Sequence, residues 1–414
     1  MHCRRYQPDR DREAVRRIWR EVGWLPAAPG KGGREEACDL MFESGVSWVA
    51  ELDGQPECAV GTAMGGVRHL QDELRLTVLT SVATSRIARR QGLPRRLMAR
   101  ALADNAEAGA LVAALGMFEQ GYYNQVGFGT GSYEHEVAFD PASLKVKASP
   151  RVPRRMTADD WQAAHAARLT RLGGHGRSCL TSPGMTRANM LLSANGFGLG
   201  YQDVAEGSFS HYLWCETEHV ERGPYTVCWM AYQRGDQFLE LMALLKSLGD
   251  QVHLVKMGEP PSIQMQDLLD KPFTRQETTE RSRFEASIRA YAWWQMRILD
   301  LGSCLAGTHL PWGEVRFNLS LTDPVEGYLE GESRWRGCGG EYVVTLGQQS
   351  SAVAGSDPSL PTLTTTVNAF TRLWLGVLPA SSLAVTDELT APPDLLRQLD
   401  EVLRLPLPRP DWGF

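Results

Sequence analysis

The sequence has no long hydrophobic run and no closely spaced cysteine pair. No apolar stretch approaches the roughly 18 residues of a membrane-spanning helix. The arginines near the N-terminus are not followed by the apolar segment of a signal peptide. The eight cysteines are scattered, with no Cys-x-x-Cys motif, which is typical of buried thiols in a reducing compartment. We therefore expect a cytoplasmic protein that does not associate with a membrane.

A strong excess of charge is also missing. The formal net charge is −6 over 414 residues, and the arginines are interspersed with acidic residues, so the composition does not indicate nucleic-acid binding. The hydrophobic fraction of 43% and the charged fraction of 22% are typical of a globular protein with ample core material. At about 150 residues per domain, the length corresponds to two or three domains.

Residues 74–136 contain the clearest pattern in the chain. Alternating apolar and β-branched residues predict a strand over 74–85, and one-faced apolar spacing predicts a helix that begins near Pro94. Between them lies a basic, glycine-containing turn at 89–92. Because a helix N-terminus presents free backbone N–H groups and the positive end of the helix dipole, this arrangement suits a phosphate group. An ordinary basic loop that enters a surface helix would give the same local pattern.

A second buried strand at 110–115 follows, and it leads into Glu-Gln-Gly-Tyr-Tyr-Asn-Gln-Val-Gly-Phe-Gly at 119–129. This order resembles the GNAT superfamily of acyl-CoA-dependent N-acyltransferases. In that family an Arg-x-x-Gly-x-Gly/Ala turn holds the coenzyme A pyrophosphate, and a tyrosine precedes a Gly-Phe/Tyr-Gly turn. Arg89 and Gly92 match the first motif, whereas Pro94 replaces its last small residue.

The organisation of the whole chain resembles one branch of that superfamily, the Eis (enhanced intracellular survival) type N-acetyltransferases. The features that carry this resemblance are the turn at 89–93, the segment 119–129, Trp-Gln-Met-Arg-Ile-Leu-Asp at 294–300 and the terminal Phe414. The resemblance implies an α/β (α+β) fold in three parts. These are a catalytic GNAT domain at 1–146, a degenerate second GNAT-like domain at 147–290 and a sterol-carrier-protein-like domain at 291–414.

The same resemblance implies the residues of the site. Tyr123 would be the general acid, and the α-carboxylate of Phe414 would accept a proton. Acetyl-CoA would be the cosubstrate, and no metal is expected. The residues that would bind acetyl-CoA are Val82, Ala83, Arg89, Arg90, Gln91, Gly92, Leu93, Pro94, Arg95, Phe118 and Glu119.

Amine acylation requires the chemistry that these groups offer. A neutral amine attacks the thioester, so a substrate ammonium must lose a proton, and the leaving thiolate gains from receiving one. A phenol with a pKa of about 10 can supply that proton. An α-carboxyl group with a pKa of about 3.5 is a poor base in water, and burial in a cleft would make it a stronger one.

Structural alternatives remain for both catalytic candidates. Tyr123 could be a core tyrosine, and the adjacent Tyr122 could be the acid instead. The C-terminal tail is stiffened by prolines and ends in Trp412-Gly413-Phe414. Such a tail could pack onto the protein for stability alone.

Three other features have both a functional and a structural interpretation. Glu35, Glu36 and Asp39 could line an amine pocket or form a solvated helix face. We expect His175 to lie in a flexible glycine loop without a catalytic role. We expect the glycine-rich run at 196–200 to be a loop or hairpin and not a phosphate site, because it contains no arginine.

These observations predict an acetyl-CoA-dependent N-acetyltransferase. Its substrate would be a primary amine of a small polycationic molecule, aminoglycoside-like or polyamine-like, or of a peptide. The alternative is an apolar-ligand-binding protein with a vestigial acyltransferase domain, which Pro94 and the many apolar residues after 291 favour. A third hypothesis is acetylation of lysine side chains on proteins. The family tendency to form symmetric assemblies leads us to expect a homo-oligomer.

Overall fold

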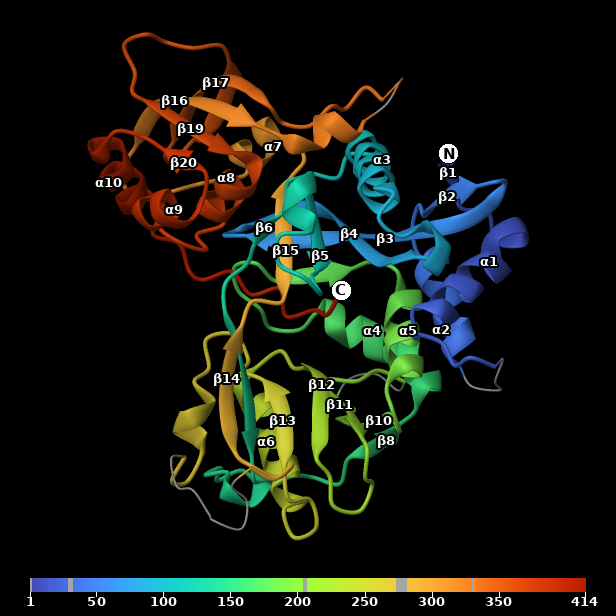
Figure 1. Cartoon of the computed structure of the whole chain (residues 1–414). Coiled ribbons are helices and arrows are strands. Elements are labelled where there is room, and N and C mark those ends of the chain that lie inside the picture. Colours follow the sequence, from blue (N-terminus) through green and yellow to red (C-terminus); the bar gives the residue numbers. More distant parts are fainter. Residues whose placement is uncertain (1, 29–32, 204–206, 273–280, 330, 332) are drawn as a thin grey trace. The chain divides into compact units, whose positions relative to one another are not determined.

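The computed structural model describes residues 2–28, 33–203, 207–272, 281–329, 331 and 333–414. The chain forms two compact units. The first unit contains Met1–Ser132, Gly174–Ser182 and Ala292–Phe414, and the second contains Tyr133–Gly173 and Pro183–Tyr291. The two ends of the chain therefore fold together in one unit (Figure 1).

The main sheet of the first unit has the order β1-β2-β3-β4-β5-β15-β6, and β9 pairs with β3. Its strands are β1 (His2–Arg5), β2 (Trp48–Leu52), β3 (Gln55–His69), β4 (Asp72–Thr84), β5 (Val112–Gly116), β6 (Gly129–Thr130), β9 (Ser178–Leu180) and β15 (Trp294–Ile298). Only β4 and β5 pair in parallel, and helix α3 (Leu93–Glu107) connects them. Strand β15 comes from much later in the chain and lies between β5 and β6 (Figure 1).

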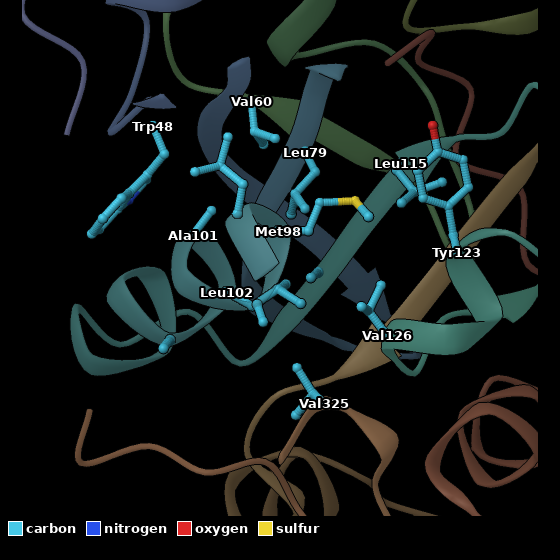
Figure 2. Packing of buried hydrophobic residues seen from close by; sticks show 14 of the residues in the cluster. Trp48, Val60, Leu79, Met98, Ala101, Leu102, Leu115, Tyr123, Val126 and Val325 are labelled. Atoms are coloured by element: carbon cyan, nitrogen blue, oxygen red, sulfur yellow. The ribbon is translucent and has the colours of Figure 1, made fainter. Parts of the chain in front are cut away.

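Helix α3 packs its apolar face onto this sheet. Figure 2 shows Met98 of the helix beside Leu79 of the sheet, and Ala101, Leu102 and Val60 belong to the same buried cluster. All five side chains are almost completely buried. Their spacing is the one-faced helical pattern that the sequence predicts, so burial of this face accounts for the position of α3. The other helices in the first third of the chain are α1 (Pro8–Glu21) and α2 (Arg34–Glu43).

The last third of the chain adds a separate sheet to the first unit, with the order β18-β17-β16-β19-β20. Its strands are β16 (Val315–Thr322), β17 (Gly340–Leu346), β18 (Ser351–Ala354), β19 (Thr362–Thr366) and β20 (Leu389–Thr390). The helices of this part are α7 (Leu301–Ala306), α8 (Val367–Trp374), α9 (Ala380–Thr386) and α10 (Pro393–Val402). Short 3₁₀ turns of the first unit are η1 (Arg86–Ala88), η2 (Tyr123–Val126) and η6 (Pro324–Tyr328).

The second unit contains one sheet with the order β14-β7-β13-β12-β11-β10-β8. Its strands are β7 (Glu134–Phe139), β8 (Arg154–Met156), β10 (Phe197–Tyr201), β11 (His211–Thr217), β12 (Tyr225–Ala231), β13 (Val255–Gly258) and β14 (Ser287–Tyr291). Its helices are α4 (Trp161–Leu169), α5 (Pro183–Leu192) and α6 (Gly235–Ser247). Strands β12 and β13 are parallel and flank α6 in sequence, so they repeat the order β4-α3-β5.

The predicted α/β (α+β) class is confirmed by these mixed sheets and their helices. The glycine-rich run at 196–200 contributes most of β10, which pairs antiparallel with β11, as expected for a hairpin. The division into three domains expected from the sequence stays a prediction. Within the described ranges, no helix is both long enough and apolar enough to span a membrane.

Candidate functional site

An extra residue near the end of β4 shapes the first part of the site. The register between β3 and β4 shifts between Ala59 and Gly61, and Ser81 adopts a φ of 56°. Such a bulge bends a strand and increases its twist. Strand β4 pairs with β5 only over residues 76–78. The predicted cofactor-binding residues Val82 and Ala83 therefore lie beyond the last pair between the two parallel strands.

The turn that follows β4 exposes its basic side chains. Arg89, Arg90 and Gln91 are all exposed. Arg90 and Gly92 adopt left-handed backbone conformations, with φ values of 63° and 73°. Neither Arg89 nor Arg90 forms an ion pair or a side-chain hydrogen bond with another residue in the described ranges. Both guanidinium groups are therefore available to an anionic ligand.

The first turn of α3 has no internal acceptor for its N–H groups. Gly92 occupies the N-cap position, no side chain caps the turn, and no acidic residue lies in it. Pro94 has no N–H group and suits the start of a helix. The replacement of the motif's last small residue by Pro94 is thus compatible with the start of the helix. An uncapped helix N-terminus beside two unpaired arginines offers N–H donors and positive charge to a phosphate group.

The equivalent helix of the second unit begins differently. Gln237 accepts hydrogen bonds from the backbone N–H groups of Gln233 and Arg234 at 2.8 and 3.2 Å. Asp236 also places a carboxylate in the first turn of α6. Because the carboxylate already interacts with the helix dipole, this helix start is much less attractive to an anion than that of α3.

Arg95 has partners already. Its guanidinium group donates to the side-chain oxygen of Gln125 and to the hydroxyl of Tyr328, the latter at 3.4 Å. The same group lies 5.6 Å from the centre of the Tyr328 ring. A contact between Arg95 and a phosphate would therefore require these contacts to be exchanged. The other predicted residue at the helix start, Leu93, is buried in the core.

The loop after β5 brings three aromatic rings together. Phe118 is exposed, at 71% of its maximum, and Glu119 beside it is exposed as well. The Phe118 ring lies 5.9 Å from that of Tyr122 and 5.6 Å from that of Tyr123. The two tyrosine rings are 5.2 Å apart and perpendicular.

Tyr123 begins the 3₁₀ turn η2 and is only 3% exposed. Figure 2 shows its hydroxyl group pointing away from the packed side chains of the core. Burial raises the pKa of the Tyr123 phenol, and the neighbouring Tyr122 adds to this effect. The phenol therefore keeps its proton at neutral pH and can donate it. Burial also raises the pKa of Tyr122, so the direction of the pKa shift does not distinguish the two candidates.

The C-terminus of the chain reaches the end of β5. A Cβ atom placed on Gly116 would lie 3.2 Å from an oxygen of the Phe414 carboxylate. The Phe414 ring lies 5.8 Å from that of Trp293. Tyr123 belongs to the same apolar cluster as Leu115, which directly precedes Gly116. The Phe414 carboxylate thus lies beside the last residue of β5, and Tyr123 packs in the apolar cluster that includes Leu115 of the same strand.

The tail that ends in Phe414 is fixed by backbone hydrogen bonds. Arg409 donates its N–H to the carbonyl of His175 at 3.0 Å, and Ser178 donates to the carbonyl of Pro410 at 2.8 Å. Trp412 is buried, with 2% exposure. These contacts give the terminal carboxylate a defined position.

His175 lies in this anchor, and its surroundings contradict the predicted flexible loop. The ring is 6% exposed. Its Nδ1 accepts from the N–H of Leu70 at 3.1 Å, and its Nε2 donates to the carbonyl of Leu375 at 2.9 Å. These two bonds fix a neutral imidazole, and burial lowers the pKa of His175 accordingly. Its role is structural.

Most acidic side chains of α2 form ion pairs with arginines of α1. Asp39 pairs with Arg16, and Glu35 pairs with Arg20 at 2.5 Å and with Arg16 at 3.6 Å. A substrate ammonium would have to compete with these guanidinium groups. The ion pairs favour the structural interpretation of this helix face over an amine pocket.

No family model and no curated protein sequence matches this chain. Solved structures do match it over its whole length. A probable N-acyltransferase from Enterococcus faecalis has a TM-score of 0.76 at 17% identity, covering 100% of this chain and 99% of its own. A GCN5-related N-acetyltransferase from Anabaena variabilis has a TM-score of 0.75 at 13% identity, and Eis1 from Mycobacterium abscessus has 0.74 at 15%. Both comparisons cover 100% of each chain.

This chain has the GNAT fold. The expectation from the turn at 89–93 and the segment 119–129 is thereby confirmed for the fold, and the similarity to Eis1 extends over the whole chain. The sterol-carrier-like character of residues 291–414 stays a prediction. So do the roles of the individual site residues.

Proposed function

We propose that the protein is an acetyl-CoA-dependent N-acetyltransferase that acetylates a primary amine. The observation that carries this proposal is the conjunction of two features in the first unit. One is the uncapped start of α3 with the unpaired arginines Arg89 and Arg90. The other is the Phe414 carboxylate beside Gly116 at the end of β5, with Tyr123 in the apolar cluster that includes Leu115 of that strand. The names of the structural neighbours, which are N-acyl- and N-acetyltransferases, support the same reaction class.

In this proposal the pyrophosphate of acetyl-CoA binds at the turn and the first residues of α3. The donors are the backbone N–H groups of this segment and the side chains of Arg89, Arg90, Gln91 and Arg95. Gly92 and Leu93 contribute their backbone alone, and Pro94, which has no N–H group, contributes only its shape. The backbone at Val82 and Ala83 holds the acyl end beyond the last β4–β5 pair. The exposed loop at 118–119 also contacts acetyl-CoA.

In this proposal, the Tyr123 phenol and the Phe414 carboxylate carry out the proton transfers of amine acetylation. The neutral amine nitrogen forms a bond to the thioester carbonyl carbon, and the carbon–sulfur bond breaks. The departing thiolate takes the phenolic proton of Tyr123. The carboxylate of Phe414 accepts the proton that the nitrogen loses, directly or through a water, and solvent returns a proton to the phenol. The products are an N-acetyl amide and the free thiol of coenzyme A.

The finer assignments rest on the resemblance to Eis-type enzymes. The proposed substrates are small polycationic molecules, aminoglycoside-like or polyamine-like, or peptides. We also propose the division at 1–146, 147–290 and 291–414, a location in the cytoplasm and a homo-oligomeric state. Size-exclusion chromatography with light scattering would test the last of these.

Thiol release from acetyl-CoA in the presence of an amine panel tests the function. The panel should contain aminoglycosides, polyamines and lysine peptides, and the protein should have an untagged C-terminus. We expect Tyr123→Phe to reduce turnover by about 10²- to 10⁴-fold. Tyr122→Phe is the matched control and should retain activity. Full activity in Tyr123→Phe would remove this residue from the proton-donor role.

The alternative function is binding of an apolar ligand by residues 291–414 with a vestigial acyltransferase domain. Native mass spectrometry of the purified protein distinguishes the two. A co-purified lipid, together with no binding of coenzyme A, would favour the alternative. Tight coenzyme A binding without lipid would favour the enzyme, even if the first panel lacked the right amine.

A further inference from the structure

Glycines in the segment after Tyr123 make room for the last third of the chain. A Cβ atom on Gly127 would lie 2.4 Å from Nη1 of Arg297, and Gly127 has a φ of 89°. A Cβ atom on Gly129 would lie 2.4 Å from the carbonyl oxygen of Asn368. Contacts this short do not occur between real Cβ atoms and backbone or guanidinium atoms. Both glycines are thus explained by the close approach of β15 and α8.

Asn368 uses this close approach to hold the turn that carries Tyr123. Its side-chain amide donates to the carbonyl of Asn124 at 2.8 Å and to the carbonyl of Phe128 at 2.9 Å. These carbonyls lie at the start and just beyond the end of η2. A four-residue 3₁₀ turn satisfies few of its own backbone groups, and its hydrogen bonds have poor geometry. The two bonds from Asn368 therefore bridge the turn from outside.

Two polar side chains of β15 hold the same segment from the sheet. Arg297 is fully buried and donates to the carbonyl of Val126, the last residue of η2. Its guanidinium group also forms an ion pair with the buried Asp323, at 2.5 Å. Gln295, also fully buried, donates to Oδ1 of Asn124 at 2.9 Å. Together with Asn368, they occupy acceptors on three residues around Tyr123.

We propose that Asn368 is a positioning residue for Tyr123, and that Arg297 assists it from β15. The inference rests on the proposed function, because it assigns the last third of the chain a part in that reaction besides delivering Phe414. Among the described residues, the Asn368 side chain donates to two backbone carbonyls, those of Asn124 and Phe128, and it takes no part in proton transfer. It acts by fixing η2 and thereby the position of the phenol.

The test is a double-mutant cycle of Asn368→Ala with Tyr123→Phe. Asn368→Ala should reduce kcat by about 10- to 100-fold, because a displacement of about 1 Å has an effect of this size. The KM for acetyl-CoA should stay within about twofold, because the turn at 89–95 is not touched. In the Tyr123→Phe background the same substitution should have no further effect, since it acts through the phenol.

The chain offers a matched control in Asn318. Its side-chain amide also bridges two carbonyls, of Asp357 and Leu360, at 2.8 and 3.1 Å, far in sequence from η2. Asn318→Ala should leave kcat nearly unchanged. Hydrogen exchange provides a readout independent of turnover. Asn368→Ala should accelerate exchange of the Gly127 and Phe128 amides, which donate to Asn124 and Tyr123, and Asn318→Ala should not.

Each outcome decides the proposal. Equal losses of kcat in both backgrounds would mean a general structural effect and would overturn it, as would faster exchange without a loss of kcat. Unchanged exchange at these amides would show that Asn368 does not hold the turn. If the wild-type protein neither releases thiol with any amine nor binds coenzyme A, the proposed function fails. In that case, faster exchange in Asn368→Ala alone would still support its hold on η2.

Discussion

A buried histidine pair should make the first unit sensitive to acid. His69 at the end of β3 is fully buried, stacks on Trp374 at 4.2 Å and meets the ring of His175 at 5.0 Å. Thr308 donates its hydroxyl hydrogen to the carbonyl of Cys304, so His69 Nε2 must donate to the Thr308 oxygen, at 3.2 Å. Nδ1 of His69 has no partner among the described residues. Protonation at Nδ1 would create a buried charge without an acceptor.

The size of the effect follows from the linkage between proton binding and folding. Burial, with a smaller contribution from His175, lowers the pKa of His69 from 6.5 to about 3. Below pH 6.5 His69 is protonated in the unfolded chain but stays neutral in the folded protein. The free energy of unfolding therefore falls as the pH falls. The loss should reach about 2 kcal/mol at pH 5 and approach about 5 kcal/mol near pH 3. Above pH 6.5 this residue contributes no pH dependence.

Urea unfolding at pH 7, 6, 5 and 4 measures this loss. His69→Gln is the informative variant, because its amide can still donate to Thr308 but does not titrate. The difference in free energy of unfolding between wild type and variant should shift by about 2 kcal/mol between pH 7 and pH 5. His309→Gln, at a half-exposed side chain beside Asp72, is the control and should follow the wild type. A difference that stays constant from pH 7 to pH 4 would refute the reasoning.

Three further changes test the site and its support. Arg89→Ala combined with Arg90→Ala should raise the KM for acetyl-CoA about tenfold with kcat nearly unchanged, because two exposed phosphate contacts are lost. Arg397→Ala, at an exposed side chain of α10, is the control. An unchanged KM in the double variant would mean that acetyl-CoA binds elsewhere. One glycine added after Phe414 should lower kcat about 100-fold without changing the circular dichroism, because the carboxylate leaves its place beside Gly116; full activity would remove the terminal carboxylate from the mechanism. Arg297→Met should destabilise the first unit by about 3–5 kcal/mol in urea unfolding, since it leaves Asp323 buried and unpaired; adding Asp323→Asn should recover part of that loss, and no loss at all would contradict the buried pair.

The local part of the site could be predicted from the sequence. The strand, basic turn and helix over 74–102 are specified by nearby residues through periodicity, turn chemistry and the proline at the helix start, and the structure has them in that order. The aromatic segment at 118–123 follows a short strand for the same reason. All of these features depend on neighbours in sequence.

The remainder depends on contacts across long separations. The segment 294–300 is one of the features that carry the resemblance to Eis-type enzymes. Nothing in its composition shows that β15 lies between β5 and β6. Asn368 has no local signal, because one asparagine near a helix start is typical of many helices. The burial of His175 was missed for a related reason. Its partners, Leu70 and Leu375, are distant in sequence, while the glycines beside it suggested mobility.

The position of β15 has a consequence for the newly made chain. When residues 1–132 have left the ribosome, β5 and β6 are present, but the strand that belongs between them has not been synthesised. At about 5–20 residues per second, the interval before β15 emerges is roughly 8–33 s. During that time β5 presents an unpaired, strongly apolar edge, which is a template for association with other chains. The first sheet is thus completed only after most of the protein has been translated, and fragments that end before residue 294 should depend on chaperones to stay in solution.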